Sequence, residues 1–259
     1  MKDSWNPAQY EKFKEERSQP FLDLLQTLQP LPPKATALDL GSGTGELTAL
    51  FHNRFHPQTT VGLERSEAML NKATPFQIGG LSFLQGDIET WSASKTYDVI
   101  ISNAALQWCR DHKNLLARIK EALKDQGQIA IQMPMNHDYA THVLAKKMSE
   151  EPHWNKLLKG EVYDKYSALL TPEEYAHVLF NLGFKKQNVF LKVYGHVLSS
   201  REDVVEWVKG SLLTYFQSRL TPEDYENFIK EFKERLFKDL PDEKPFFYPF
   251  KRLFIWAQL

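Results

Sequence analysis

One segment of the chain passes from a short apolar run into a glycine-rich turn and then into an amphipathic stretch. The run Thr36–Leu40 leads into Gly41-Ser42-Gly43-Thr44-Gly45, and a helix is expected over 46–55. Glycine lets the backbone turn tightly and approach a ligand, and the first N–H groups of the helix point into the same space. In a doubly wound sheet, ligands bind at such a turn. A turn that serves packing alone is the alternative.

Apolar runs and amphipathic stretches alternate from residue 36 to residue 134, which is typical of βαβ units around a parallel sheet. A helix is expected over 112–124, because Asp111 can cap its start and Gly127 follows its end. The sequence therefore predicts a doubly wound, mostly parallel α/β sheet. The expected strands are 36–40, 60–64, 81–84, 97–101 and 128–132.

The second half of the chain is mainly helical and contains two further strand-like runs, 189–197 and 251–257, which indicate an antiparallel edge strand. We expect a single domain over 1–259, with an N-terminal cap helix at about 8–28, a core at about 34–134 and a helical lid at about 199–244 inserted before the last strand. Further helices are expected over 136–149, 172–182, 200–217 and 222–238.

Composition excludes several classes of protein. The 259 residues carry a net charge of -1, so no general basic field is available to hold a nucleic acid. No apolar run is long enough for a membrane span, and the first residues lack the apolar core of a secretion signal. The single cysteine, Cys109, cannot form an internal disulfide and favours a reducing compartment, so we expect a cytoplasmic protein. A monomer is expected as well. The histidines lack metal-binding spacing, so no metal is expected.

An acidic residue lies about 20 residues after the glycine turn. Glu64 ends the second expected strand, where a carboxylate that accepts ribose hydroxyl protons is found in such folds. The dinucleotide pattern would need a glycine where Glu46 stands, so a pyrophosphate at the turn is disfavoured. The sequence therefore predicts a ligand with a ribose but no diphosphate. Truncation of Glu64 to Ala is expected to leave the fold intact and to weaken binding of this ligand.

The spacing Asp39-x-Gly41-x-Gly43-x-Gly45, together with Glu64, Asp87 and the segment 101–104, resembles the class I S-adenosylmethionine-dependent methyltransferases. The resemblance implies that the loop passes under the methionine part of S-adenosylmethionine, that Glu64 holds the ribose, and that Asp87 and Ile88 contact the adenine. The full set of expected cofactor-binding residues is Asp39, Gly41, Ser42, Gly43, Gly45, Glu64, Arg65, Asp87, Ile88, Asn103, Ala104, Trp108, Tyr10 and Arg17.

Other segments resemble the trans-aconitate 2-methyltransferase family more narrowly. These are Trp5-Asn6-Pro7 with the residues up to Pro20, the segment 102–108, Gln132-Met133-Pro134 and Arg252-Leu253-Phe254-Ile255. The resemblance implies that Tyr10, Phe13 and Arg17 close the pocket. Two departures concern substrate choice: Thr214 stands where the family has an arginine, and Met135-Asn136-His137 replaces Asp-Asn-Trp. A threonine cannot make the bidentate contact that selects a carboxylate.

Two other functions stay open. Ser102-Asn103, Gln107-Trp108-Cys109 and Lys209-Gly210 also resemble the malonyl-carrier-protein methyltransferases of biotin synthesis. Such a substrate needs a basic docking patch, for which Lys146, Lys147, Lys156 and Lys159 form the proposed cluster. The third possibility is a protein that binds S-adenosylmethionine without catalysis.

The expected reaction needs alignment of the reactants more than it needs a base. A carboxylate with a pKa near 4 is already ionised at neutral pH, so no catalytic base is predicted. Cations and aromatic side chains are left to orient the acid. The expected substrate-binding residues are Arg17, Trp108, Trp207, Lys209, Tyr248 and Arg252. In the alternative interpretation Trp207 belongs to the core of the lid, and Lys251-Arg252 is a solvated pair.

Overall fold

The computed structural model describes residues 14–164 and 168–259, with side chains described from Ser18 onward. Tyr10 and Phe13 lie outside the described residues, and only the backbone of Arg17 is described. The described residues divide into two compact units: a sheet unit of 17–134, 168–192 and 252–259, and a helical unit of 14–16, 135–164 and 193–251. The division falls within strands β6 (Lys186–Leu198) and β7 (Phe246–Gln258). Each unit is described by itself.

The sheet unit is built on a mostly parallel sheet in the order β3-β2-β1-β4-β5-β7-β6. Parallel pairing joins β1 to both β2 and β4, and β7 runs antiparallel to β5 with Gln128 opposite Gln258. This confirms the predicted doubly wound fold; the antiparallel strand lies one position inside the edge, which β6 forms. The remaining strands are β1 (Thr36–Leu40), β2 (Thr59–Glu64), β3 (Leu81–Gln85), β4 (Tyr97–Asn103) and β5 (Leu123–Pro134).

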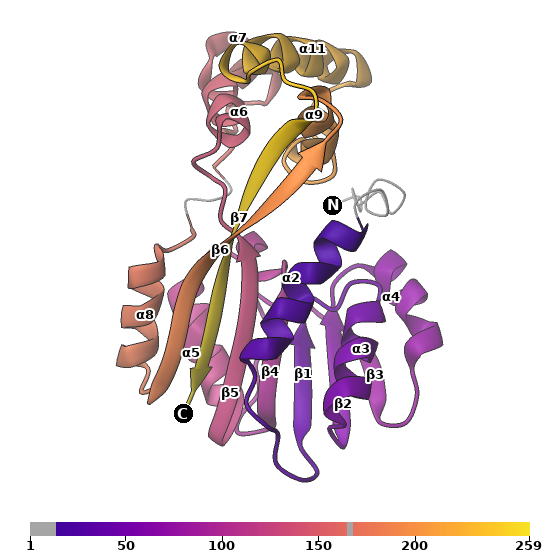
Figure 1. Ribbon diagram of the computed structural model, residues 1–259, viewed down its shortest axis with the longest axis vertical. Helices are drawn as coiled ribbons and strands as arrows, with labels where there is room; N and C mark the ends of the chain where they lie inside the picture. Colours follow the sequence, from indigo (N-terminus) through magenta and orange to yellow (C-terminus); the bar gives the residue numbers. More distant parts are fainter. Residues whose placement is uncertain (1–13, 165–167) are drawn as a thin grey trace. The chain divides into compact units, whose positions relative to one another are not determined.

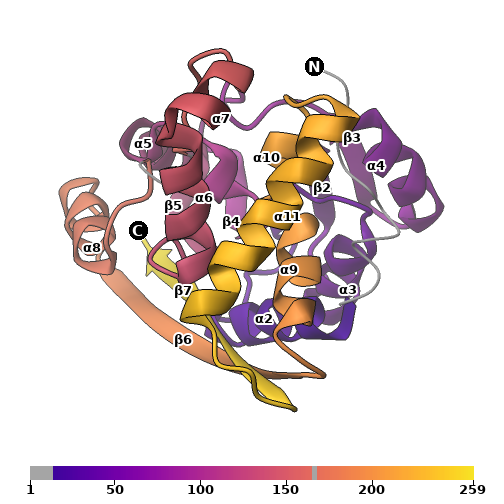
Figure 2. The same ribbon diagram turned by 90° about the horizontal axis from the view of Figure 1, so that it is seen from above.

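Helices cover both faces of the sheet, because the central strands are apolar on both sides. Leu38 of β1, Ile100 of β4 and Ile129 of β5 are fully buried. Figures 1 and 2 show α2 and α3 on one face and α5 and α8 on the other. The helices of this unit are α2 (Lys14–Thr27), α3 (Glu46–Phe55), α4 (Glu67–Ala73), α5 (His112–Ala122) and α8 (Pro172–Asn181).

Two expectations for this unit were wrong in detail. Helix α5 ends at Ala122, because Leu123 already adopts the extended conformation and begins β5. Gly127 therefore lies inside the strand and does not end the helix. Helix α4 was not predicted; it has only seven residues, and Ser66 caps it by accepting a hydrogen bond from the Met69 N–H.

The helical unit packs helices around an aromatic core. Phe216 stacks on Phe228 with ring centroids 4.1 Å apart, and Trp154 meets Phe228 edge-on at 4.9 Å. Figure 2 shows these helices from above. The expected helix over 200–217 is two helices, because α9 ends at Lys209 and Gly210 forms its C-cap. The helices are α6 (Ala140–Glu150), α7 (Pro152–Leu157), α9 (Glu202–Lys209), α10 (Thr214–Gln217) and α11 (Pro222–Asp239).

No helix among the described residues is long and apolar enough to cross a membrane. The boundaries of the single domain, the cap helix and the lid stay predictions.

Candidate cofactor site

The three glycines of the turn after β1 serve different purposes. Gly41 has φ +84°, and a Cβ there would lie 2.2 Å from the Cβ of Ala105. At Gly45 a Cβ would lie 2.7 Å from the Phe83 ring. At Gly43, with φ +55°, a Cβ would meet no atom within 4 Å. Gly41 and Gly45 are therefore required for packing, whereas Gly43 borders open space that a ligand can enter.

Glu64 lies directly opposite this turn. One oxygen of its carboxylate, Oε2, accepts a hydrogen bond from the Gly43 N–H at 3.0 Å, and Oε1 accepts one from the Ser66 N–H at 2.8 Å. The N–H groups of Gly41 and Ser42 donate to the Leu63 carbonyl, which ties the turn to β2. Glu64 thus shapes the turn itself. Its truncation would disturb the turn as well as any ligand contact.

Asp39 lies beneath the turn in a buried position. Its Oδ2 accepts a hydrogen bond from the Thr48 hydroxyl at 2.6 Å. Burial raises the pKa of this carboxyl to about 7; the Thr48 hydrogen bond opposes the rise and the charge of Glu64 adds to it. Asp39 is therefore a structural link between β1 and α3 with a carboxyl group that titrates near neutral pH.

The loop after β3 carries Asp87 and Ile88 at the same edge of the sheet. The Gly86 N–H donates to the Glu64 carbonyl at 3.0 Å, so this loop begins beside Glu64. A guanidinium nitrogen of Arg65 lies 3.7 Å from Asp87 Oδ2, in an ion pair that is largely exposed. The Ile88 side chain would lie 3.6 Å from a Cβ on Gly41. The predicted adenine-contacting residues therefore adjoin both the turn and the predicted ribose acid.

The loop after β4 completes this edge. Ala104 adopts φ +53°, its N–H donates to the Gln132 carbonyl, and its own carbonyl accepts from the Gln107 side chain at 2.7 Å. The Ser102 hydroxyl donates to the Leu40 carbonyl at 2.7 Å and links β4 to β1. Asn103 and the half-buried Trp108 flank this bend.

Several buried polar atoms at this edge have no hydrogen-bond partner within the described residues. They are Asp39 Oδ1, Ser42 Oγ, Asn103 Oδ1, Gln107 Oε1 and both amide atoms of Gln132. Buried polar atoms are normally paired, so a group of unpaired ones is typical of a polar ligand site. Asp39, Ser42 and Asn103 were predicted; Gln107 and Gln132 were quoted only for their resemblance. A glutamine within the apolar strand β5 is the feature that could have indicated Gln132.

The predicted substrate-binding residues are distributed over both units. Trp108 and Arg252 belong to the sheet unit, and Arg252 is only 5% exposed opposite Pro134. Its depth in the strand pair argues against the solvated-pair interpretation of this arginine. Lys251 does form an ion pair, at 2.7 Å from Asp138.

Arg17 also belongs to the sheet unit, and the remaining three predicted residues belong to the helical unit. Trp207 and Tyr248 are 4% and 5% exposed, and their rings lie 5.9 Å apart. Trp207 also packs on His196 at 4.7 Å, which supports the core interpretation. Lys209 forms an ion pair with Glu206 one turn away on α9. Thr214 donates a hydrogen bond to the Ser211 carbonyl.

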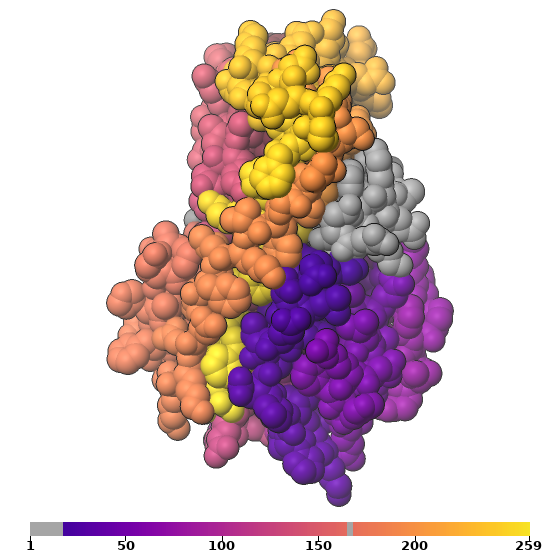
Figure 3. Space-filling view, viewed as in Figure 1, coloured from indigo at the N-terminus to yellow at the C-terminus, as the bar shows by residue number. Residues whose placement is uncertain are grey.

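No group of residues suited to a metal ion is found in the parts of the chain that the structure describes. Cys109 is buried, and burial raises the pKa of its thiol to about 12, so it behaves as a small apolar residue. A groove of about 420 Å³ between α2 and β6, with Trp256 among its lining residues, contains none of the predicted site residues. Figure 3 shows β7 in yellow between the orange β6 and the indigo α2.

Comparisons with known proteins identify the family of this chain. A family model described as a methyltransferase domain matches residues 13–189. The trans-aconitate 2-methyltransferase of Deinococcus radiodurans is 41% identical over 98% of both chains, and that of Variovorax paradoxus is 35% identical over 98% of both.

Solved structures support the fold. The YcgJ protein of Bacillus subtilis superposes with a TM-score of 0.63 at 16% identity, covering 93% of this chain and 98% of that one. A phosphoethanolamine N-methyltransferase of Haemonchus contortus, solved with S-adenosylmethionine, gives a TM-score of 0.54 at 17% identity over 92% of this chain and 52% of that one. With the two relatives over nearly the full length, the chain belongs to the trans-aconitate 2-methyltransferase family and is a methyltransferase.

Proposed function

We propose that this protein transfers a methyl group from S-adenosylmethionine to a carboxylate oxygen of a small polycarboxylic acid such as trans-aconitate. The observation that carries the proposal is the edge formed by β1, β2 and β4. There the open side of Gly43, the carboxylate of Glu64 and the unpaired buried polar atoms of Ser42 and Asn103 meet. This is the chemistry that an amino acid joined to a nucleoside requires.

The residues of this edge suit the three parts of S-adenosylmethionine. Glu64 keeps a free lone pair on each oxygen after accepting from Gly43 and Ser66, so it can still accept ribose hydroxyl protons. Asp87 and Ile88 offer an acceptor and an apolar surface to the adenine. The turn and the β4 loop offer the methionine part the residues Asp39, Gly41, Ser42, Gly43, Gly45, Asn103 and Ala104, and Trp108 follows in the same loop. Arg65 lies beside Asp87, on the adenine side. The contacts of Tyr10 and Arg17 stay predictions from the resemblance.

When bound, S-adenosylmethionine supplies an electrophilic methyl group on a positively charged sulfur. The acceptor carboxylate is ionised at neutral pH, so the chain needs no base to activate it. The task of the residues is to align the acceptor and to exclude water, and alignment alone can account for roughly 7–11 kcal/mol of the barrier. We propose that Arg252, which is buried in β7, is the cation that holds an acidic substrate, with Trp108 of the same unit as a further contact. Arg17, Lys209 and Tyr248 stay predicted contacts, and the burial of Trp207 favours its core interpretation.

The acceptor is a small acid in this proposal, because the relatives that match nearly the full length are named for trans-aconitate. Thr214 lacks the charge of an arginine and uses its hydroxyl within its own turn, so we expect weaker binding of a tricarboxylate than an arginine at this position would give. We also propose that the protein acts in the cytoplasm as a monomer and binds neither nucleic acid nor membrane.

The test is transfer of labelled methyl from S-adenosylmethionine to trans-aconitate, related di- and tricarboxylates, and a malonyl-loaded carrier protein. Label on trans-aconitate supports the proposal. Label on the carrier alone would show that the carrier protein, and not trans-aconitate, is the methyl acceptor. The docking surface to test by salt titration would then be formed by the exposed residues Lys146, Lys147, Lys156 and Lys159. Binding of S-adenosylmethionine without transfer to any acceptor would contradict catalysis of this kind.

A further inference from the structure

The loop that carries Asp87 and Ile88 is closed by its own hydrogen bonds. Asp87 Oδ1 accepts from the Glu89 N–H at 2.9 Å, and the Asp87 carbonyl accepts from the Trp91 N–H at 2.8 Å. These bonds use the carbonyl and side chain of Asp87 but leave the carbonyls of Ile88 and Trp91 directed elsewhere. The conformation of the loop therefore depends on what those two carbonyls bind.

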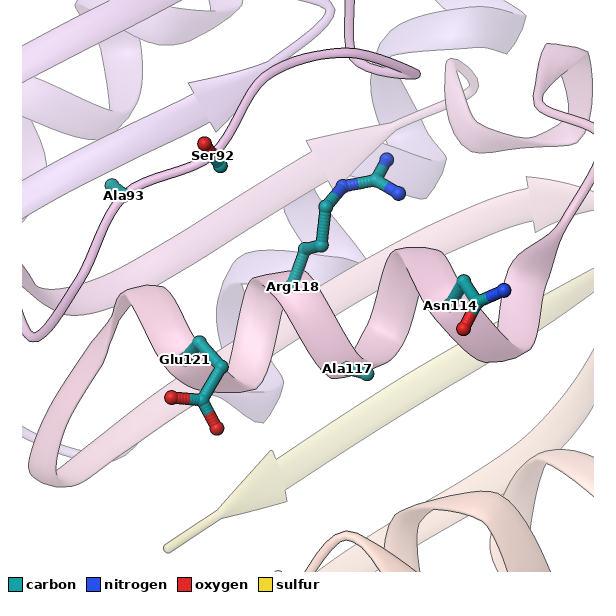
Figure 4. Close-up of a pocket in the computed structure, with 6 residues that line it drawn as sticks. All are labelled: Ser92, Ala93, Asn114, Ala117, Arg118 and Glu121. Atoms are coloured by element: carbon teal, nitrogen blue, oxygen red, sulfur yellow. The ribbon is translucent and has the colours of Figure 1, made fainter.

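Both carbonyls bind one arginine on α5. Arg118 donates from Nη2 to the Ile88 carbonyl at 3.0 Å and from Nε to the Trp91 carbonyl at 3.2 Å. In Figure 4 its side chain extends from α5 on the side that faces the segment of Ser92 and Ala93, whereas Glu121 points the other way. Arg118 also lines a surface pocket of about 500 Å³ there.

The helix that carries Arg118 is itself fixed. On the same helix, Leu115 is 1% exposed and Ile119 is fully buried. A guanidinium is planar, so two of its N–H donors hold two acceptors at a set separation. A third hydrogen bond, from the Arg110 N–H to Glu89 Oε1 at 2.9 Å, joins the same loop to the segment before α5. The loop is thus held by two hydrogen bonds from α5 and by one from the segment before it.

We propose that Arg118 is a positioning residue for the adenine end of the cofactor site. It fixes the Ile88 and Trp91 carbonyls and so sets where Asp87 and Ile88 meet the base. The inference rests on the proposed function, because it assumes that an adenine lies against this loop. Without the guanidinium, both carbonyls turn to water and the loop no longer holds the acceptor and the apolar side chain in one place.

The test compares two ligands that differ only in the base. S-adenosylhomocysteine presents an amino group to Asp87, whereas S-inosylhomocysteine carries hypoxanthine and lacks that donor. Calorimetry gives both dissociation constants for the native protein, for Arg118→Gln, for Arg118→Lys and for the control Lys113→Gln, which removes the same charge from an exposed position of α5. Thermal unfolding of each variant reports whether it is folded.

We expect the native protein to prefer the adenine ligand by at least tenfold. Arg118→Gln should weaken binding of S-adenosylhomocysteine about tenfold and bring the ratio of the two dissociation constants close to one. Arg118→Lys keeps the charge but loses the planar pair of donors, so its ratio of dissociation constants should lie between those of the native protein and Arg118→Gln. If Arg118→Gln does not fold, Arg118→Lys takes its place as the test. Lys113→Gln should keep the native ratio.

A merely structural role predicts something else, since a loosened fold would weaken both ligands by the same factor and leave the ratio unchanged. That result, or a native ratio near one, overturns the inference while the proposed function stands. Failure of the native protein to bind S-adenosylhomocysteine at all would instead contradict the proposed function.

Discussion

The carboxyl edge of the sheet and the interior of the helical unit use their side chains in opposite ways. At the edge, Gly43 faces open space and polar atoms of Ser42 and Asn103 are buried without partners. In the helical unit, Trp207 is 4% exposed and lies against the rings of His196 and Tyr248. Substitutions at the edge should therefore change ligand affinity before stability, and substitutions in the helical core should do the reverse.

The largest expected effect tests the second half of that comparison. Trp207→Ala removes a buried ring from contact with His196, Tyr248 and Phe250, and we expect a loss of about 3–5 kcal/mol in the free energy of unfolding. Urea denaturation measures it. Unchanged stability with a raised KM for the acid would show that Trp207 contacts the substrate and is not a core residue.

The next effect tests the edge. Glu64→Gln keeps a side chain of the same shape but removes the charge and one acceptor, and we expect cofactor affinity to fall by about 1.5–3 kcal/mol, or roughly tenfold to a hundredfold. The exposed Glu67 on α4 gives a matched control, since Glu67→Gln removes the same charge three residues away. Calorimetry with S-adenosylhomocysteine measures both. Equal affinities for native protein and Glu64→Gln would remove Glu64 from the site.

Local sequence patterns predicted the edge well, because each of its parts follows from neighbours in the chain. Strand β1 and helix α3 have the predicted bounds, since the glycine turn marks the end of one and the start of the other. The spacing from that turn also indicated Glu64, which contacts Gly43. A short loop fixes where its ends lie, so sequence distance there translates into contact in space.

The parts that were missed depend on contacts between distant residues. Gln132 and Arg118 lie beside this edge only because β5 and α5 pack next to loops from elsewhere in the chain. The Trp91 and Ile88 carbonyls, to which Arg118 donates, are 27 and 30 residues away from it. No spacing rule describes such a pair. The break between α9 and α10 was missed for a related reason: the apolar pattern continues through it, and Gly210 alone marks the end of α9.

A smaller effect is expected from the hydrogen bond that joins α8 to α5. The Tyr175 hydroxyl of α8 lies 2.7 Å from His112 Nδ1 at the start of α5, and both residues are buried. Tyr175→Phe leaves that nitrogen without its partner, and we expect a loss of about 1–2 kcal/mol in the free energy of unfolding. Chemical denaturation at pH 7.5 measures it. A change of less than a few tenths of a kcal/mol in the free energy of unfolding would show that the hydroxyl contributes no net stability.

The same pair predicts a dependence on pH. Burial lowers the pKa of His112, so the unfolded chain binds a proton at this residue more readily than the folded protein. The stability that His112 contributes is present above pH 6.5 and is lost as the pH falls below that value. His112→Asn should therefore lose less stability than the native protein between pH 7 and pH 5, as thermal unfolding across that range would show. If the stability of the native protein and that of His112→Asn fell equally between pH 7 and pH 5, the lowered pKa of His112 would be contradicted.

The smallest effect is expected at Lys209, which is neither part of the cofactor edge nor fully buried in the helical core. Lys209 is half-buried on α9 and pairs with Glu206 one turn away, and a pair of this kind contributes about 0.5 kcal/mol or less. If Lys209 also contacts the acid, the substrate must compete with Glu206 for it, so Lys209→Gln should raise KM only about threefold. Glu206→Gln is the matched control, because it frees Lys209 and should lower KM. A rise in KM in both variants would mean that Lys209 acts through its ion pair with Glu206 and does not contact the acid directly.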